Sequence, residues 1–246
     1  MTAPLLATEA VRRRYGSLAA VDGVDLAVEA GTRHALIGPN GAGKTTLLDL
    51  VAGGARPDAG RIRLAGRDVT ALGPARRARL GIGRTHQRPA VWPTLSTLDN
   101  MVVAGWRSPA ARTGRGGRTN RLRRDAADLL DRLGLTAAAG TPAGHLSHGQ
   151  RRQLEIAMAL FGEPRLVLLD EPAAGLAAPD LRRLWDLLAD LPRTVTVLLV
   201  EHRLDLVYAL ADTVTVLRAG RVVDSGPPAE IRRSGAARLA FAEAVG

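Results

Sequence analysis

Apolar positions along the chain fall into two kinds of pattern. Leu166–Leu169 and Thr194–Val200 are almost continuous apolar runs, the pattern of strands that are buried on both faces of a parallel sheet. Other stretches repeat their apolar residues at helical spacing, and we expect helices at Thr97–Trp106, at Asp125–Leu133, from just after Ser147 to about Phe161, and at Pro179–Leu191. Strands that alternate with helices in this way predict an α/β fold.

Shorter elements complete the prediction. We expect a first pair of strands at Leu5–Val11 and Val24–Val28, broken by Gly16 and Gly23, and a basic helix at Pro74–Leu80. The other expected elements are strands at Arg61–Leu64 and Ile82–Gln87, three segments that finish the sheet at Leu204–Leu210, Val214–Leu217 and Arg221–Val223, and terminal helices within Pro228–Val245.

A glycine-rich turn joins a predicted strand to a predicted helix within residues 33–53. Gly38, Gly43, Lys44 and Thr45 fill the phosphate-loop pattern of a glycine, four residues and then Gly-Lys-Thr. Glycines let backbone N–H groups turn toward phosphate oxygens, and the following helix points its positive end at the same place. Lys44, the only lysine in the chain, is then placed to reach the outer phosphates, and Thr45 to ligate Mg²⁺.

Acidic and histidine side chains follow the two apolar runs. Asp170 and Glu171 end the first run, and Glu201 and His202 end the second. Ligands bind beyond the carboxyl ends of parallel strands. We therefore expect Asp170 to hold Mg²⁺, Glu171 to orient or deprotonate an attacking water, and His202 to contact a γ-phosphate. Paired acids at a strand end also serve as helix caps, but the phosphate loop upstream favours the catalytic interpretation.

Other polar residues have two interpretations each. Ser147, at a predicted helix start, is a capping residue or a second reader of phosphate. Tyr15 stacks on a nucleotide base or packs on the surface, and Gln87 at a strand end meets a ligand or caps its loop. The arginine-dense run Arg107–Arg124 is a binding patch or, as we expect, in part a mobile and solvated loop.

Composition narrows the setting of the protein. A chain of 246 residues can bury a large core, and we expect one domain with a helical lobe. The net charge of +10 raises nucleic acid or an anionic membrane surface as partners. Cysteine is absent, which excludes disulfides and thiolate metal sites. The N-terminus lacks a signal-peptide pattern, and no apolar run approaches the roughly 18 residues of a membrane span, so we expect a soluble or peripheral, cytoplasmic protein.

Taken in order, these stretches resemble the ATP-hydrolysing subunits of ABC transporters over nearly the whole chain. The matching motifs are the Walker A loop at Gly38–Thr45, the Q-loop at Gln87, the signature motif at Ser147–Gln150, Walker B at Leu166–Asp170, the switch histidine at His202 and the base-stacking aromatic at Tyr15. The resemblance implies an α/β P-loop NTPase fold with a mixed sheet core, an antiparallel β subdomain and a helical subdomain.

The resemblance also implies how the chain is divided and which ligands it takes. Residues 1–246 would form a single ABC ATPase domain. Its catalytic core with the β subdomain would comprise residues 1–87 and 160–246, its helical subdomain about 88–159, and its C-terminal helices 228–246. The implied cofactors are ATP and Mg²⁺, the metal being held by Thr45, Gln87 and Asp170.

Roles for single residues follow from the same resemblance. Glu171, His202 and Gln87 are implied in catalysis. Contacts to ATP are implied for Tyr15, Gly38, Pro39, Asn40, Gly41, Ala42, Gly43, Lys44, Thr45, Thr46, Ser147, His148, Gly149 and Gln150.

Finer features resemble one subgroup, the ATPases of branched-chain amino-acid importers and their urea and amide relatives. These features are Ile82–Gln87, Gln153–Ala157, Asp170–Leu176 and Val200–His202. The family resemblance implies a head-to-tail dimer, with each ATP held between the Walker motifs of one subunit and the signature motif of the other. It implies integral-membrane permease partners at the cytoplasmic face of the plasma membrane and, indirectly, an extracellular solute-binding protein. A homodimer and a pair with a sister ATPase both stay open.

Four positions depart from the family pattern. His148 replaces the first glycine of the signature pair, and His86 stands where phenylalanine is common. Ala177 replaces the usual aspartate or asparagine of the D-loop, which puts communication between the two sites in doubt, and Arg203 follows the switch histidine where aspartate is frequent.

Two other classes of protein share part of this pattern. An ABC-type ATPase acting on nucleic acid or the ribosome fits the positive charge. Chromosome-type relatives, however, insert a very long coiled coil, whereas only 103 positions (147 − 44) separate Lys44 from Ser147, and ribosome-associated relatives carry two cassettes per chain. A small-molecule phosphoryl transferase would not need Ser147–Gln150. We therefore expect an importer ATPase with no nucleic-acid partner.

Overall fold

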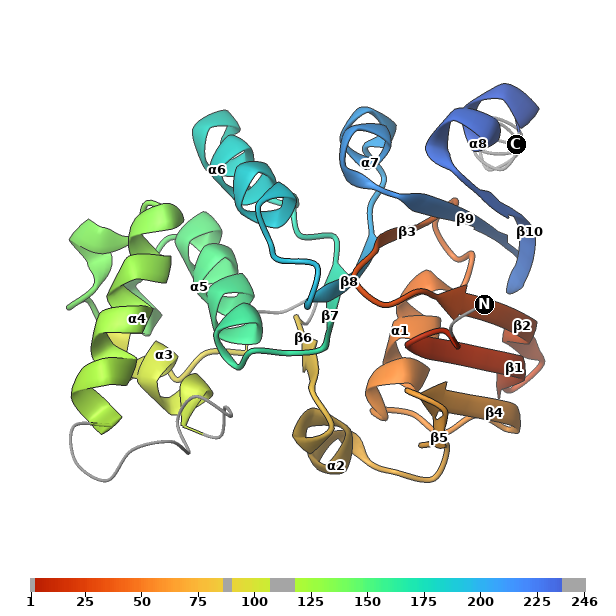
Figure 1. The fold of residues 1–246 in the computed structure, drawn as a ribbon, viewed down its shortest axis with the longest axis horizontal. Coiled ribbons are helices and arrows are strands. Elements are labelled where there is room, and N and C mark those ends of the chain that lie inside the picture. The colour runs from red at the N-terminus through yellow and green to blue at the C-terminus, as the bar shows by residue number, and fades with distance from the viewer. Residues whose placement is uncertain (1–2, 86–89, 107–117, 236–246) are drawn as a thin grey trace.

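The computed structural model describes residues 3–85, 90–106 and 118–235, and it contains two β-sheets and several helices (Figure 1). The strands are β1 Leu6–Tyr15, β2 Leu18–Val28, β3 Arg33–Ile37, β4 Ala59–Leu64, β5 Arg67–Asp68, β6 Ile82–Arg84, β7 Leu166–Asp170, β8 Thr196–Val200, β9 Thr213–Arg218 and β10 Arg221–Gly226. The helices are α1 Lys44–Ala52, α2 Pro74–Arg79, α3 Thr97–Gly105, α4 Arg118–Arg132, α5 His148–Phe161, α6 Ala178–Ala189, α7 Leu204–Leu210 and α8 Pro228–Ser234.

Six strands form a mixed sheet in the order β10-β9-β3-β8-β7-β6. All neighbours in it are parallel except β10, which is antiparallel to β9. Every residue of β3, β7 and β8 is buried, as expected for the continuous apolar runs. Asp170 pairs with Val200, so the carboxyl ends of these two neighbouring strands lie side by side. This confirms the predicted proximity of the residues that follow them.

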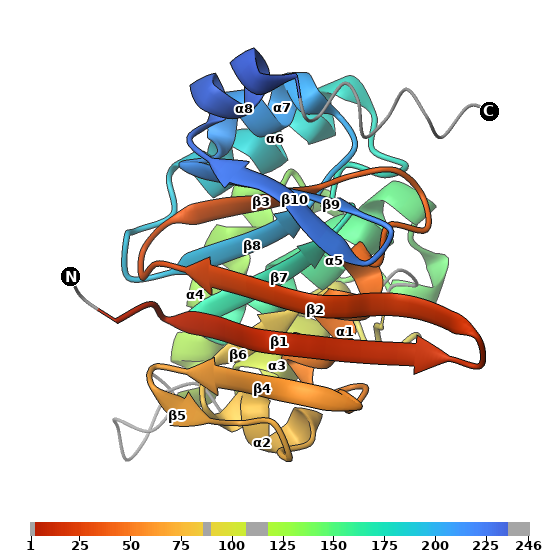
Figure 2. The ribbon, with the colours of Figure 1, turned by 90° about the vertical axis from the view of Figure 1, so that its right-hand side faces the viewer.

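The second sheet is antiparallel, in the order β2-β1-β4-β5, and Figure 2 shows it in front of the mixed sheet. Its first two strands are longer than the sequence indicates. Val11 pairs with Val24 and Arg12 with Asp22, so Gly23 between them, with a φ of 70°, is the extra residue of a β-bulge and does not end β2. Of the two predicted breaks, only the one at Gly16 separates β1 from β2.

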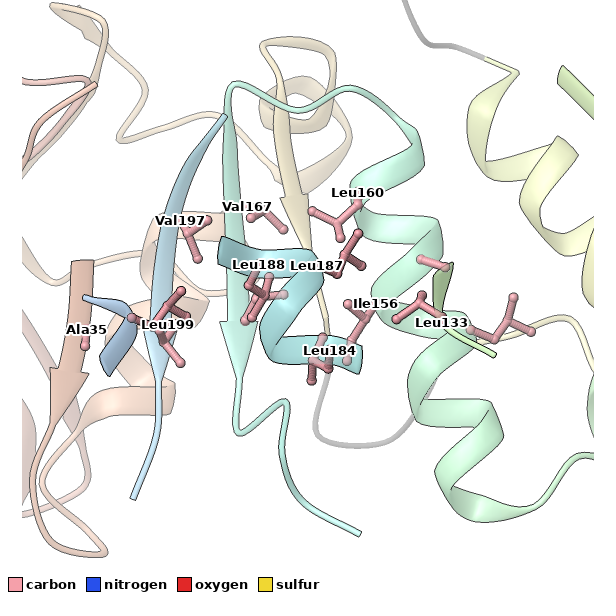
Figure 3. Packing of buried hydrophobic residues seen from close by; sticks show 14 of the residues in the cluster. Ala35, Leu133, Ile156, Leu160, Val167, Leu184, Leu187, Leu188, Val197 and Leu199 are labelled. Carbon is pink, nitrogen blue, oxygen red and sulfur yellow. The ribbon is translucent and has the colours of Figure 1, made fainter. Parts of the chain in front are cut away.

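Apolar side chains from the mixed sheet enter two cores. One face, which includes Leu36 and Leu198, packs with α1 and the antiparallel sheet. The opposite face, which includes Val197 and Leu199, packs with α5, α6 and α7. Figure 3 shows the helical residues that gather over this second face, among them Ile156, Leu160, Leu184, Leu187 and Leu188.

One predicted strand was wrong. The segment Leu204–Leu210 is the helix α7 and does not join the sheet. Leu204, Val207 and Leu210 recur every third residue, and all three pack into the core beneath α6 and α7. This helical spacing has more weight than the alternation of Leu204 and Leu206 that suits a strand.

The arginine-dense run also contains more helix than expected. Helix α4 begins at Arg118, upstream of the expected start at Asp125, because buried Leu122, about one turn before buried Ala126, continues the apolar face toward the N-terminus. Residues 107–117 of the run lie outside the described residues, and so does Gln87. No helix within the described ranges is long and apolar enough to cross a membrane.

Candidate active site

The loop between β3 and α1 is shaped by glycines. Gly38 has a φ of 149° and Gly43 a φ of 99°, and a Cβ added to them would lie 2.0 Å from the Leu217 carbonyl oxygen and 2.1 Å from the Ala20 carbonyl oxygen, respectively. Any other residue would therefore collide with backbone at both positions. Gly43 caps α1 without a side-chain hydrogen bond, so the N–H groups of the first turn are left for a ligand.

Lys44 is buried at the start of α1, with 6% of its surface exposed. Its ammonium group donates hydrogen bonds of 2.8 Å to the carbonyl oxygens of Gly38 and of Pro39, and so closes the loop around itself. Burial lowers the pKa of Lys44, while the nearby Glu171 and Asp170 carboxylates act in the opposite direction. The two acids at the end of β7 therefore lie within electrostatic reach of the phosphate loop.

Asp170 is the buried carboxylate at the end of β7, with 1% of its surface exposed. The Thr45 hydroxyl donates a 3.3 Å hydrogen bond to Oδ1 of Asp170. Burial raises the pKa of the Asp170 carboxyl, and the Thr45 hydrogen bond opposes this rise. Among the described residues Oδ2 of Asp170 has no hydrogen-bond partner. A buried oxygen without a donor, beside a hydroxyl, suits a hard cation such as Mg²⁺, which takes few protein ligands and completes its shell with phosphate and water.

Glu171 and His202 meet across the ends of β7 and β8. Nε2 of His202 lies 2.6 Å from Oε1 of Glu171, and both side chains are partly exposed. Glu171 has a φ of 49°, a left-handed conformation that a non-glycine residue adopts at a cost and that is concentrated at functional sites. Its N–H donates to the Val200 carbonyl oxygen at 2.9 Å, which fixes this strained backbone to the neighbouring strand.

Ser147 to Gln150 form the start of α5. The Ser147 hydroxyl accepts from the Gln150 N–H at 3.2 Å, and the Gln150 side chain accepts from the Ser147 N–H at 2.9 Å, which is a capping box. The capping interpretation of Ser147 is therefore confirmed. A Cβ on Gly175 would lie 2.8 Å from the His148 ring, so the loop after Glu171 packs against the position where this chain departs from the signature pattern.

The remaining predicted site residues lie at the end of β1 and around the phosphate loop. Tyr15 ends β1 with 48% of its surface exposed, and the Arg13 guanidinium lies 4.8 Å from its ring centroid. The Ala42 carbonyl oxygen accepts from the Gly220 N–H at 3.0 Å. Asn40 and Gly41 are exposed at the tip of the phosphate loop, and Thr46 is partly buried in α1.

Sequence reasoning missed the polar side chains that hold the backbone of Asp170. The Asp170 N–H donates to the Thr85 hydroxyl at 3.1 Å, and the Arg152 guanidinium donates to the Asp170 carbonyl oxygen. Arg152 also donates to Glu155 at 2.6 Å, and both side chains are at least 95% buried. The available signal was their i, i+3 spacing on a helix whose other buried residues are mostly apolar.

Comparisons with known proteins agree on one family. The ABC transporter family model matches residues 21–174. The branched-chain amino acid transport ATP-binding protein BraF of Pseudomonas aeruginosa is 38% identical, over 94% of this chain and 95% of that protein. The sulfate/thiosulfate import ATP-binding protein CysA 2 of Chromobacterium violaceum is 41% identical over 98% of this chain, which spans only 63% of that protein's length.

Solved structures give the same result. A crystal structure of an ATP-binding cassette of an ABC transporter superposes with a TM-score of 0.84 at 29% identity, over 100% of both chains. A nucleotide-free ATP-binding cassette gives a TM-score of 0.79 at 28% identity, over 94% of both chains. With its phosphate loop, its strand-end acids and a family match over more than half of its length, the chain belongs to the ABC transporter family, as one of its ATP-binding cassettes.

Proposed function

We propose that this protein is the ATP-hydrolysing subunit of an ABC importer. The observation that carries the proposal is the 2.6 Å contact between Glu171 and His202 at the ends of adjacent strands, within electrostatic reach of Lys44. A carboxylate in contact with an imidazole beside a phosphate-binding loop is the arrangement needed to activate a water for attack on a terminal phosphate.

Each residue of the site has a proposed role. Lys44 and the first N–H groups of α1 bind the β- and γ-phosphates of ATP. Thr45 and Asp170 would hold Mg²⁺, which would neutralise charge on the phosphates. Glu171 accepts the proton of the attacking water, and His202 holds the Glu171 carboxylate and contacts the γ-phosphate. Gln87 is proposed as a further catalytic residue and as a further ligand of the metal.

The start of α5 is proposed to act in a dimer. Ser147 to Gln150 would bind the nucleotide held by a second ABC ATPase subunit, identical or related, so that ATP closes the dimer and hydrolysis reopens it. Within the single domain, residues 1–87 and 160–246 would be the catalytic core with the β subdomain, and about 88–159 the helical subdomain. That subdomain and Gln87 would transmit the motion to membrane permeases at the cytoplasmic face of the plasma membrane.

Branched-chain amino acids or related small amides are the proposed solutes, delivered by an extracellular solute-binding protein. The support is that the chain spans nearly the full length of BraF and of LivG from Salmonella typhimurium, which is 35% identical. It spans 63% of the sulfate/thiosulfate import protein and 48% of the ribose import protein RbsA 3 of Rubrobacter xylanophilus. The import names of these relatives disfavour an ATPase that acts on nucleic acid.

The test of the catalytic role is the Glu171→Gln variant. It removes the proton acceptor but keeps the size of the side chain, so we expect ATP binding to persist while turnover falls by roughly 10²–10⁴. Steady-state ATPase assays and calorimetric titration of ATP measure the two effects separately. As a matched control, Lys44→Ala should weaken ATP binding itself. Unchanged turnover in Glu171→Gln would refute the proposed role.

The solute and the partners need a different experiment. Tagged protein purified from gently solubilised native membranes should carry permeases with several membrane spans and, for a heterodimer, a sister ATPase, all identified by mass spectrometry. Ribosomal proteins or nucleic acid, without a permease, would contradict the importer proposal.

A further inference from the structure

Glu201 is a buried carboxylate that has no role in the mechanism above. It follows β8, and only 3% of its surface is exposed. Its Oε1 accepts the Ala173 N–H at 3.0 Å, and its Oε2 accepts the His202 N–H at 2.9 Å and the Arg203 N–H at 3.4 Å. Three backbone donors from two loops therefore converge on one side chain.

The partners of Glu201 are all backbone groups. The guanidinium of Arg203, two residues along the chain, donates to Asp205 at 3.3 Å, and no ion pair to Glu201 is found among the described residues. Burying a carboxylate costs free energy of folding unless its oxygens accept hydrogen bonds. Because several backbone N–H groups can satisfy a carboxylate as a charge-assisted acceptor, these two loops and Glu201 stabilise one another.

The two loops carry the two ends of the reactive contact. Ala173 lies two residues after Glu171, and the His202 N–H held by Glu201 belongs to the residue whose ring contacts Glu171 at 2.6 Å. The Glu171 N–H also donates to the Val200 carbonyl oxygen, directly before Glu201. Residues 171–173 and 200–203 are thus joined in three ways: by the Glu171 N–H bond to Val200, by the side-chain contact of Glu171 with His202, and by the Ala173 N–H bond to Glu201.

We propose that Glu201 is a positioning residue for ATP hydrolysis: its carboxylate joins the loop after Glu171 to the loop at His202 and so keeps these two side chains within hydrogen-bond distance. This inference rests on the proposed catalytic function of Glu171. Glu201 itself is buried, with its carboxylate oxygens bound to backbone N–H groups. It acts through the backbone of Ala173 and His202.

Glu201→Gln is the sharpest perturbation, because it keeps the shape of the side chain and replaces one acceptor oxygen by an NH₂ group that cannot accept a backbone N–H. One loop then loses its acceptor. A displacement of about 1 Å at a reacting group costs on the order of 10²-fold in rate. We expect kcat to fall between about tenfold and 10²-fold, with less than a twofold change in the Kd of ATP measured by calorimetric titration.

Two further variants control for folding and for charge. Glu201→Asp keeps both oxygens on a shorter stem, and we expect it to fold and to lose less turnover than Glu201→Gln. Glu29→Gln removes one charge from an exposed position at the end of β2 and should leave kcat unchanged. Melting temperatures of all variants show whether the assays are run on folded protein.

A double-mutant comparison separates positioning from a general structural role. Glu171→Gln already lacks the proton acceptor that Glu201 positions, so adding Glu201→Gln to it should lower turnover by much less than Glu201→Gln lowers the turnover of wild type. Full additivity of the two losses, or wild-type turnover in Glu201→Gln, would overturn the inference. Wild-type turnover in Glu171→Gln alone would instead refute the proposed function, so the two failures are distinguishable.

Discussion

His34 makes the stability of the fold depend on pH. It lies on β3, directly upstream of the phosphate loop, with 2% of its surface exposed. Its Nε2 is 2.7 Å from the Thr215 hydroxyl, which is itself 2.7 Å from the Ser225 hydroxyl. Burial lowers the pKa of His34 from 6.5 to about 4. The imidazole is therefore neutral in the folded protein over a range in which it is charged in the unfolded chain.

The sign and size of the effect follow from these two pKa values. Between pH 6.5 and pH 4 the unfolded chain binds more protons at His34 than the folded protein does, so the free energy of unfolding falls as the pH falls. At pH 7.5 the contribution is negligible. The loss is about 2 kcal/mol at pH 5 and about 3 kcal/mol at pH 4, since one pKa unit corresponds to about 1.4 kcal/mol. Such a loss is a large part of the stability of a typical domain.

Urea unfolding at pH 7.5, 6.5, 5.5 and 5.0 measures the effect when wild type is compared with His34→Gln. Glutamine retains a hydrogen-bonding group for Thr215 but does not titrate, so the variant should lose about 2 kcal/mol less than wild type between pH 7.5 and pH 5. Asp170, whose raised pKa has the opposite sign, is common to both proteins and cancels. Exposed His145 supplies the control His145→Gln, which should follow wild type. Parallel pH profiles for wild type and His34→Gln would refute the reasoning.

Three other substitutions test single contacts. Arg77 is fully buried and donates to the carbonyl oxygens of four residues, two of them at the end of α1. Arg77→Met should therefore lower the free energy of unfolding by about 3 kcal/mol, whereas the exposed control Arg79→Met should change it little. Equal stability of the two variants would contradict this prediction. Gly43→Ala should weaken ATP binding at least about tenfold by titration, because its Cβ would meet backbone at 2.1 Å; wild-type affinity would refute the steric argument. Gly175→Ala should reduce ATPase turnover about tenfold, because its Cβ would contact the His148 ring. Adding His148→Gly to Gly175→Ala should restore part of the lost turnover. No recovery would mean that backbone strain at residue 175 alone is responsible.

The sequence predicted those parts of the fold that depend on hydrophobic period. Continuous apolar runs identified β7 and β8 and placed Asp170 and His202 at one edge, because parallel neighbours end together. The same reasoning failed at Leu204–Leu210, where seven residues are too few to separate a strand from a helix by pattern. It also placed the start of α4 too late, since dense arginines hid the apolar positions of its first turns.

The candidate site also contains parts that the sequence could predict and parts that it could not. The local positions of Lys44 after a glycine-rich turn and of Ser147 at a helix start could be predicted from their neighbours in sequence. Contacts between polar groups far apart in the chain were not. The Thr85 hydroxyl and the Asp170 N–H are 85 residues apart, and no periodic pattern links a donor to an acceptor across such a distance.

Those distant polar contacts decide how the mixed sheet and α5 act together. Both backbone groups of Asp170 are bound by side chains, its N–H by Thr85 after β6 and its carbonyl by Arg152 in α5. Glu155, paired with Arg152, also accepts the Ala90 N–H at 3.4 Å. Arg152 lies little more than one helical turn after Ser147. A shift of the α5 start relative to the sheet must therefore either break the Arg152 bond or move the Asp170 backbone, and with it the carboxylate proposed to hold the metal.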